Sequence, residues 1–127
     1  MAVEHHTSEQ LPRPAGPYSH VTVAGGMVYT AGFGPQDPAT GAIPDEVGAQ
    51  TTAVLANVAR ALGEVGLDLR DVVKFTAHLQ DVERDFAAFN RAYEAAFEPP
   101  YPVRTTVGSD LLGILVEIDV VAAQRDT

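Results

Sequence analysis

Apolar residues alternate with polar ones in five stretches of the chain, and a period of two is typical of β-strands with one buried face. The tight reversal Ala24-Gly25-Gly26 joins the first two of them, which predicts a β-hairpin. The predicted strands are residues 21–23, 27–31, 72–79, 103–107 and 114–123.

Two further stretches carry apolar residues at the 3.6-residue period of an amphipathic helix. Gly66 is expected to end the first helix, and Asp85 to cap the second, which stops before Pro99. The buried positions are expected at Val47, Val54, Leu55, Val58, Leu62 and Val65 in the first helix, and at Phe86, Phe89, Tyr93 and Phe97 in the second. The order β-β-α-β-α-β-β predicts an α+β fold, a two-layer sandwich with both helices on one face of a mixed sheet.

The strands predict a second sheet face that no helix covers. Alternation puts Val103, Thr105 and Val107 on one side of their strand and Arg104 and Thr106 on the other. In strand 72–79, Val73, Phe75, Ala77 and Leu79 are expected on the apolar side. We expect the uncovered face to carry Arg104, Lys74, Thr76, Glu117 and Asp119. Such a face is too apolar for open solvent and too polar for a dry core, which predicts an oligomer with pockets between subunits.

The length of 127 residues indicates one domain. Residues 1–15 are polar and contain proline, so we expect a flexible N-terminal arm followed by a single domain in residues 16–127. No apolar run reaches the ~20 residues of a membrane span, and the N-terminus has no apolar signal-peptide core. These features predict a cytoplasmic protein with no membrane association.

The net charge and the residue types present argue against several kinds of binding and catalysis. A formal charge of −9 argues against sequence-independent nucleic-acid binding, which depends on Lys and Arg. The chain has no cysteine, so disulfides, thiolate zinc sites and thiol nucleophiles are excluded. Neighbouring His5 and His6 are more simply solvated than ligating, and His78 has no partner spaced to orient it. We predict no metal and no cofactor.

Arg104 and Glu117 are the candidates for chemistry on a small acid. A guanidinium in the middle of a strand is expected to contact a defined partner and not bulk water. Its planar fork suits two parallel hydrogen bonds to a carboxylate. The last strand carries two carboxylates, Glu117 and Asp119, and one of them is expected to act on the bound acid. From Arg104 and Glu117 alone, an Arg–Glu ion pair between neighbouring strands explains the pattern equally well.

Several motifs, in this order along the chain, resemble those of the YjgF/YER057c/UK114 proteins, also called the Rid family. They are Gly16-Pro17-Tyr18, Thr30-Ala31-Gly32, Pro38-Ala39-Thr40-Gly41, Phe86-Ala87-Ala88-Phe89-Asn90-Arg91-Ala92-Tyr93, Pro102-Val103-Arg104-Thr105 and Val116-Glu117-Ile118. The resemblance runs from about Leu11 to Ala123. It implies a chorismate-mutase-like fold and a homotrimer whose small-molecule sites lie in the clefts between subunits.

The resemblance also implies roles for individual residues. Arg104 matches the arginine that grips the substrate carboxylate, and Glu117 the glutamate that orients the attacking water. Tyr18 matches a pocket tyrosine and Asn90 a helix asparagine beside the site. Gly32 belongs to the same substrate-binding set, as do three positions that depart from the deaminase pattern: Ala31 for a serine, Phe33 for a glutamine and Thr106 for a cysteine. Phe33 is expected to make the pocket mouth more apolar.

The activity implied by the family is 2-iminobutyrate/2-iminopropanoate deamination, the hydrolysis of reactive imines and enamines to 2-keto acids and ammonia without a cofactor. An imine carbon is already electrophilic once its nitrogen is protonated, so a carboxylate clamp and one base suffice. The first alternative is a trimer that binds or senses small carboxylates without chemistry. The second is the endoribonuclease L-PSP activity ascribed to some family members, which the acidic charge disfavours.

Overall fold

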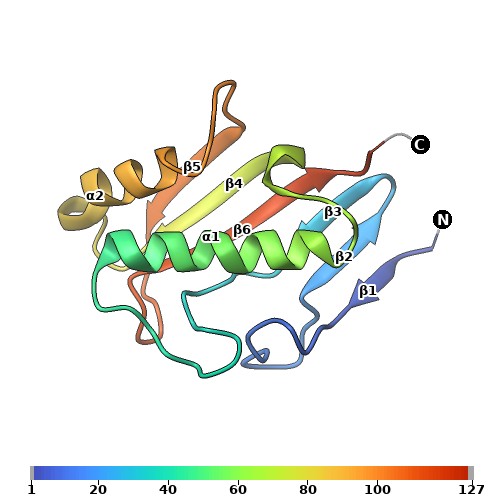
Figure 1. Ribbon diagram of the computed structural model, residues 1–127, viewed down its shortest axis with the longest axis horizontal. Coiled ribbons are helices and arrows are strands. Elements are labelled where there is room, and N and C mark those ends of the chain that lie inside the picture. Colours follow the sequence, from blue (N-terminus) through green and yellow to red (C-terminus); the bar gives the residue numbers. More distant parts are fainter. Residues whose placement is uncertain (1, 126–127) are drawn as a thin grey trace.

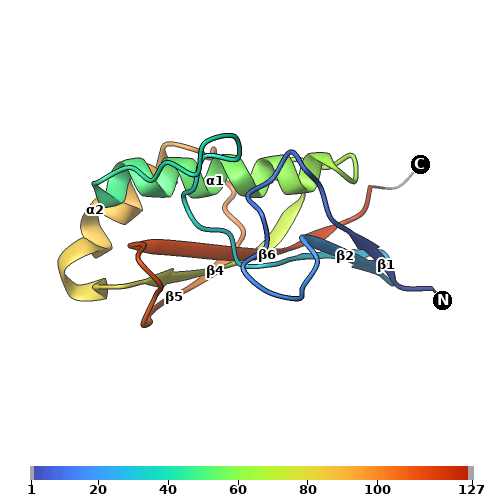
Figure 2. The same ribbon diagram turned by 90° about the horizontal axis from the view of Figure 1, so that it is seen from below.

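A six-stranded sheet forms one layer of the protein and two helices form the other, as Figures 1 and 2 show. The computed structural model describes residues 2–125. The strands are β1 (Glu4–His6), β2 (Val21–Ala24), β3 (Met27–Thr30), β4 (Val72–Leu79), β5 (Val103–Gly108) and β6 (Val116–Ala123). The helices are α1 (Val47–Gly63) and α2 (Val82–Glu94), and a 3-10 turn, η1 (Leu69–Asp71), precedes β4.

The sheet has the order β1-β2-β3-β6-β4-β5. Its strand pairs are antiparallel except β4 and β5, which are parallel and are linked through α2. Both helices cover the same face, because each has a single apolar stripe that must be buried. The core contains fully buried Val54, Val58 and Leu62 of α1, with Phe75 of β4 and Ile118 of β6. The predicted two-layer α+β fold is confirmed.

The sheet has one strand more than the sequence pattern predicts. Glu4–His6 of β1 pairs antiparallel with Val21–Val23 of β2. The chain beyond β1 also contacts the sheet, because the Ser8 N–H donates to Nδ1 of buried His20 at 3.0 Å and Leu11 is buried in the core. The polar residues of β1 show little alternation of burial, so the pairing left no signal in the sequence.

The second helix begins four residues earlier than predicted. Asp81 is its N-cap, and its carboxylate accepts a hydrogen bond from the Arg84 N–H at 3.1 Å. Asp85, the predicted cap, lies in the first turn and pairs with Arg84 Nε at 2.9 Å. Phe86 is 42% exposed, so it does not belong to the buried stripe, whereas Phe89 and Tyr93 are buried.

A β-bulge corrects the predicted face of β4. The pairing register with β6 shifts between Val72 and Lys74. The extra residue lets Val72 and Phe75 both point into the core, while Val73 is exposed. The remaining prediction for this strand, with Phe75, Ala77 and Leu79 on one buried face, is confirmed.

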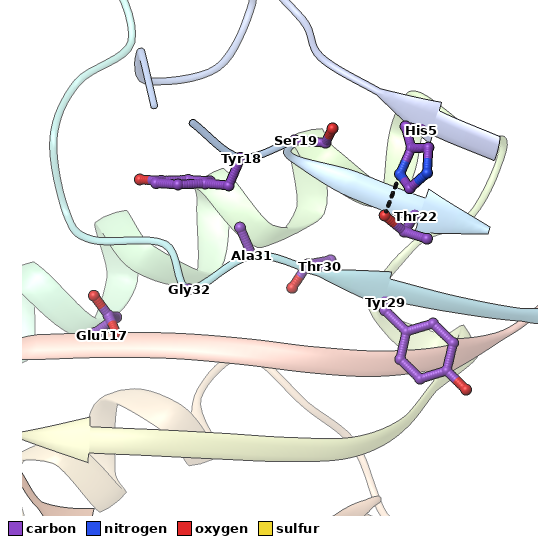
Figure 3. A pocket seen from close by; sticks show the side chains of 9 residues that line it. All are labelled: His5, Tyr18, Ser19, Thr22, Tyr29, Thr30, Ala31, Gly32 and Glu117. Atoms are coloured by element: carbon purple, nitrogen blue, oxygen red, sulfur yellow. Dashed lines mark hydrogen bonds between the residues drawn. The ribbon is translucent and has the colours of Figure 1, made fainter. Parts of the chain in front are cut away.

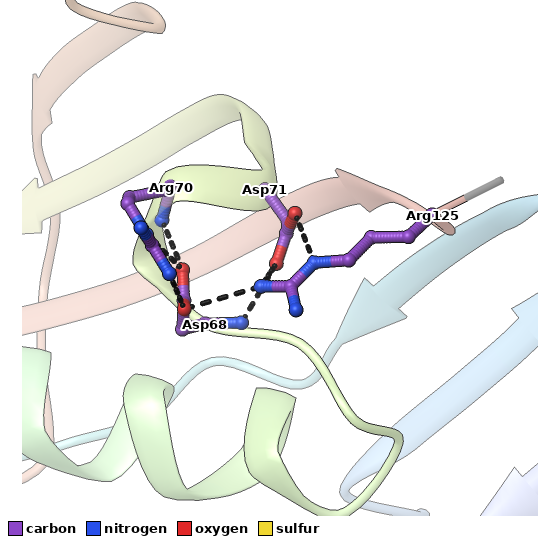
Figure 4. Close-up of polar contacts among 4 residues, drawn as sticks. All are labelled: Asp68, Arg70, Asp71 and Arg125. Carbon is purple, nitrogen blue, oxygen red and sulfur yellow. Dashed lines mark hydrogen bonds and ion pairs between the residues drawn. The ribbon is translucent and has the colours of Figure 1, made fainter. Parts of the chain in front are cut away.

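A cluster of charged residues holds the end of β6 against the turn before β4 (Figure 4). Arg125 donates to Asp71 at 3.0 and 2.7 Å and to Asp68 at 3.1 Å. Asp68 also binds Arg70, and these hydrogen bonds hold the pKa of the Asp68 carboxyl below its usual range. No helix within residues 2–125 is long and apolar enough to cross a membrane.

Candidate functional site

Arg104 lies on the helix-covered face of the sheet, at its β5 edge. The parallel register pairs Arg104 with Phe75, whose side chain is fully buried under the helices. The expectation that Arg104 shares the uncovered face with Glu117 and Asp119 is therefore wrong. The prediction that Arg104 and Thr106 lie on the same side of their strand is confirmed by the alternating burial of β5.

The Arg104 guanidinium is held by an amide and by aromatic rings. Its Nη2 donates to Oδ1 of Asn90 at 2.7 Å. Its Cζ lies 4.7 Å from the ring centroid of Tyr93, 5.2 Å from that of Phe89 and 5.9 Å from that of Phe86. Cation–π contacts and one amide oxygen fix the orientation of the group without neutralising its charge.

Arg104 has no acidic partner among the ion pairs of residues 2–125. A partly buried guanidinium without a carboxylate retains four further N–H donors for an anion. The structural alternative, an ion pair between Arg104 and Glu117, is not formed within one chain. The physical reason is that β4 separates β5 from β6 in the sheet.

Two hydroxyl groups near Arg104 have no hydrogen-bond partner within the described chain. They are the Tyr93 Oη and the Thr106 Oγ1, and both are buried. Burial also raises the pKa of Tyr93 to about 12, so this hydroxyl stays protonated and can donate. The 3.6-residue pattern predicts only a core position for Tyr93. Its spacing of three residues from Asn90 is the signal that both reach the same end of the site.

Glu117 lies on the opposite, uncovered face of the sheet and borders a cavity of about 730 Å³ (Figure 3). The cavity is lined by His5, Tyr18, Ser19, Thr22, Tyr29, Thr30, Ala31, Gly32 and Glu117. The Glu117 carboxylate packs against the backbone of Gly32, where an added Cβ would lie 2.8 Å from Oε2. No hydrogen bond to the carboxylate comes from the described residues, so its oxygens are free for a ligand or water.

Tyr18 forms the wall of this cavity opposite Glu117. Its hydroxyl accepts a hydrogen bond from the Ala15 N–H at 2.9 Å, which anchors the ring from its far end. Figure 3 shows the ring above the Ala31 methyl group, with the Glu117 carboxylate beyond Gly32. The predicted residues Tyr18, Ala31, Gly32 and Glu117 therefore meet in one place.

A second cavity, of about 620 Å³, shares Tyr18, Gly32 and Glu117 with the first. Phe33 forms part of its wall but is only 4% exposed, and its ring stacks on His20 with 5.7 Å between centroids. The expectation that Phe33 sits at the pocket mouth is corrected. Its backbone pairs with Ile118 of β6, which turns the ring into the core.

The predicted site residues thus form two separate groups. Arg104, Asn90 and Thr106 lie on the helix side of the sheet, and Tyr18, Ala31, Gly32 and Glu117 lie toward the uncovered side. Two strand spacings and a three-residue offset along β6 separate Arg104 from Glu117 by about 14 Å. One chain cannot bring both groups to a single small molecule.

His78 and Asp119 form a further polar pair on the uncovered face. His78 Nδ1 and Ser109 Oγ share a hydrogen bond at 2.8 Å, and Nε2 lies 3.7 Å from Asp119 Oδ2. Burial raises the pKa of Asp119, and His78 opposes that rise. The expectation that nothing orients His78 is corrected, because the parallel pairing of β5 brings Ser109 beside it. No cluster of three or more metal-binding side chains occurs in the described chain.

Comparison with known proteins connects this geometry to a family. A family model described as "Endoribonuclease L-PSP" matches residues 8–124. A RutC family protein of Pyrococcus abyssi is 38% identical over 125 residues, which span 96% of this chain and 98% of the relative. A Salmonella typhimurium protein named 2-iminobutanoate/2-iminopropanoate deaminase is 37% identical over 123 residues, or 93% of this chain and 95% of the relative.

A solved structure gives the same result for the fold. The crystal structure of the YjgF gene product from E. coli superposes with a TM-score of 0.88 and is 34% identical. The match covers 96% of this chain and 99% of that protein. Since the family model, full-length relatives and a full-length structure all agree, the chain belongs to the YjgF/RidA family.

Proposed function

We propose that this protein hydrolyses 2-imino and enamine carboxylates to 2-keto acids and ammonia, in sites shared between two copies of the chain. The observation that carries the proposal is the Arg104 guanidinium, which is oriented by Asn90 and aromatic rings but has no acidic partner in the described chain. Such a group is prepared for a carboxylate ligand. The deaminase name of the Salmonella relative, at 37% identity, supports the same reaction.

The separation of Arg104 from Glu117 is the reason for proposing shared sites. In a 2-imino acid the carboxylate is bonded directly to the carbon that water must attack. The clamp and the base therefore have to come within a few ångströms of each other, whereas one chain holds their Cα atoms about 14 Å apart, with the side chains on opposite faces of the sheet. A neighbouring copy that supplies Arg104, Asn90 and Thr106 to the Glu117 cavity removes the conflict. A homotrimer with three equivalent clefts is the assembly we propose.

The proposed reaction starts with the substrate carboxylate held by Arg104 and the protonated imine carbon near Glu117. Glu117 takes a proton from water as the hydroxide oxygen bonds to that carbon, which gives a neutral carbinolamine. The proton then passes from Glu117 to the amine nitrogen, and the C–N bond breaks as ammonia leaves. The hydroxyl gives its proton to the Glu117 carboxylate as it becomes the ketone, and ammonia carries that proton away as ammonium. An enamine enters the same path after protonation at its β-carbon. The neighbouring copy, by covering this open groove, excludes bulk water and strengthens both charge contacts.

The family model's name suggests RNA cleavage as a competing activity. A formal charge of −9 disfavours binding of a phosphate backbone, which depends on an excess of Lys and Arg. His78 faces Asp119 and Ser109 and not a second histidine. We therefore place imine hydrolysis ahead of RNA cleavage, and a carboxylate receptor without chemistry remains the alternative that the experiment must separate.

Replacement of Glu117 by Gln tests the catalytic role. Gln keeps the size of the side chain but cannot take a proton at neutral pH, so we expect kcat to fall about a hundredfold or more with little change in KM. Initial rates on imines made in situ by an amino-acid oxidase provide the measurement. Asp119→Asn, alone and in the double variant, is the control for a substitute carboxylate. Normal turnover by Glu117→Gln would refute Glu117 as the base, whereas ligand binding without turnover by the wild-type protein would leave only the carboxylate receptor without chemistry.

Co-expression of two inactive variants tests whether the sites are shared. Arg104→Ala and Glu117→Gln subunits each lack one half of the site. If each site takes one half from each of two copies, random mixing restores about a quarter of the wild-type sites. If each site lies within one chain, the mixture stays inactive. A mass-calibrated separation of the wild-type protein should show a trimer, and a stable, active monomer would refute the shared site.

A further inference from the structure

Two buried amide side chains interrupt the apolar stripe of α1. They are Gln50 and Asn57, and both are buried among the core residues of the helix. They lie seven residues apart, or about two helical turns, so both amides leave the same side of α1. A buried amide costs free energy unless it is hydrogen-bonded, and an apolar residue at either position would simply extend the stripe. Packing alone therefore does not explain an amide at these two positions.

The Gln50 amide holds the start of β6. Its Oε1 accepts the Leu115 N–H at 2.8 Å, and its Nε2 donates to the Pro44 carbonyl at 2.8 Å. Leu115 lies two residues before Glu117, and its own carbonyl accepts the Gln80 N–H at 3.0 Å. The backbone that leads into Glu117 is therefore fixed on one side by α1 and on the other by the end of β4.

The Asn57 amide holds the loop that follows β3. Its Nδ2 donates to the carbonyls of Gly34 and Gln36, at 3.0 and 2.9 Å. Its Oδ1 accepts a hydrogen bond from Arg60 Nη1 at 2.8 Å, which fixes the orientation of the amide. The first residues of this loop line the Glu117 cavity. The wall of the cavity is thus tied to the helix layer on the other face of the sheet.

The two held segments meet at Glu117. The Phe33 N–H donates to the Ile118 carbonyl at 2.8 Å, and the Ile118 N–H donates back to the Phe33 carbonyl at 3.0 Å. This pair joins the loop to β6 one residue beyond Glu117. Gly32 directly precedes Phe33, and the Glu117 carboxylate packs against it, as Figure 3 also shows. The backbone that carries the carboxylate and the backbone that it packs against are therefore both connected to α1 through buried amides.

We infer that Gln50 and Asn57 are positioning residues for Glu117, because they fix the two segments whose relative position sets where its carboxylate lies. The inference rests on the proposed function, since it assumes that Glu117 takes the proton from water. A base must lie within hydrogen-bond distance of that water, and a displacement of about 1 Å costs about a hundredfold in rate. The Arg104 clamp lies on another strand and is oriented by Asn90. Loss of either amide should therefore lower kcat and leave KM nearly unchanged.

Three variants of neighbouring residues in α1 test the first amide. Gln50→Met keeps the approximate volume but offers no oxygen to the Leu115 N–H, so we expect kcat to fall at least about tenfold, with KM and the dissociation constant of the 2-keto acid product within about twofold of wild type. Gln50→Glu offers a carboxyl oxygen to that N–H in either protonation state, so kcat should stay within about threefold. Thr51→Val is the matched control, because the buried Thr51 hydroxyl donates within α1, to the Val47 carbonyl at 2.8 Å. It should leave kcat unchanged.

A double variant shows whether the amide acts through the base. If Gln50 only positions Glu117, its loss has no further effect once the carboxylate is gone. Gln50→Met combined with Glu117→Gln should then keep the residual rate of Glu117→Gln within about twofold. Multiplication of the two single effects would overturn the inference, and so would a Gln50→Glu protein as slow as Gln50→Met. Asn57→Ser repeats the cycle at the loop, because one hydroxyl hydrogen cannot serve both carbonyls.

The outcomes separate this inference from the proposed function. Absence of imine hydrolysis by the wild-type protein would refute the proposed function itself. Normal kcat in Gln50→Met and Asn57→Ser, beside an active wild type, would overturn only the positioning role. If circular dichroism shows that Gln50→Met does not fold, the Asn57→Ser cycle with Glu117→Gln decides: a lowered kcat that vanishes in the double variant supports the inference, and any other pattern overturns it.

Discussion

Gly32 is the position where a single added methyl group tests the placement of the proposed base. An ideal Cβ at Gly32 would lie 2.8 Å from Oε2 of Glu117, 2.9 Å from Cδ and 3.2 Å from Cγ. These contacts are shorter than ordinary van der Waals separation. The backbone of Gly32 is not in the left-handed region, so Gly32→Ala introduces no backbone strain of its own. The substitution therefore acts on the Glu117 side chain.

The expected size of the effect follows from these distances. Ordinary contact begins near 3.4 Å, so Oε2 must move by at least about 0.6 Å. Glu117 is only partly buried and can rotate away, and a Gly→Ala change also lowers the entropy of the unfolded chain. We expect the free energy of unfolding to change by less than about 1 kcal/mol. The proposed base is nevertheless displaced, and we expect kcat to fall at least about tenfold.

The measurement combines denaturant unfolding with imine-hydrolysis rates for Gly32→Ala and a matched variant. Gly48→Ala is the control, because Gly48 lies in α1 and an added Cβ there meets no atom within 4 Å. It should raise stability by about 0.5–1 kcal/mol and leave kcat unchanged. A Gly32→Ala protein with normal kcat, beside an inactive Glu117→Gln protein, would show that the carboxylate does not depend on this contact.

Three other substitutions test the Arg104 clamp, the hydrogen bonds from Asn57 of α1 to the loop carbonyls of Gly34 and Gln36, and the charged cluster around Arg125. Arg104→Lys should lose deamination about a hundredfold with an unchanged circular dichroism spectrum, because a point charge cannot reproduce the bidentate fork; near-normal kcat would refute the clamp. Asn57→Ala should lower the free energy of unfolding by about 2–3 kcal/mol in urea, because the fully buried amide donates to two carbonyls that would lose their partner, and a loss below ~0.5 kcal/mol would contradict this. Arg125→Ala should destabilise the protein at neutral pH. The pKa values of Asp68 and Asp71 are lowered in the folded state, so their contribution is present above about pH 4 and is lost as the pH falls through the folded values. The stability difference between the two proteins should therefore shrink below that pH, and a constant difference would count against the ion pairs.

The sequence by itself determined the local features of the fold and site. Alternation in strands and the 3.6 period in helices are imposed by the backbone, so five strands, two helices and the two-layer α+β class could be read from them. The pairing of Arg104 with Thr106, and of Glu117 with Asp119, on common strand faces follows from the same period of two. These relations hold whatever the strands pair with.

Tertiary structure alone decided which faces and residues meet. Placement of β4 between β5 and β6, with Arg104 in register with Phe75, sends the guanidinium to the helix side and leaves Glu117 on the other. Strand order and register depend on contacts between residues distant in the chain, and alternation carries no information about them. The bulge near Val73 follows from the same non-local pairing. The sequence therefore predicted most residues of the candidate site, and only the folded sheet revealed that one chain holds them as two separate groups.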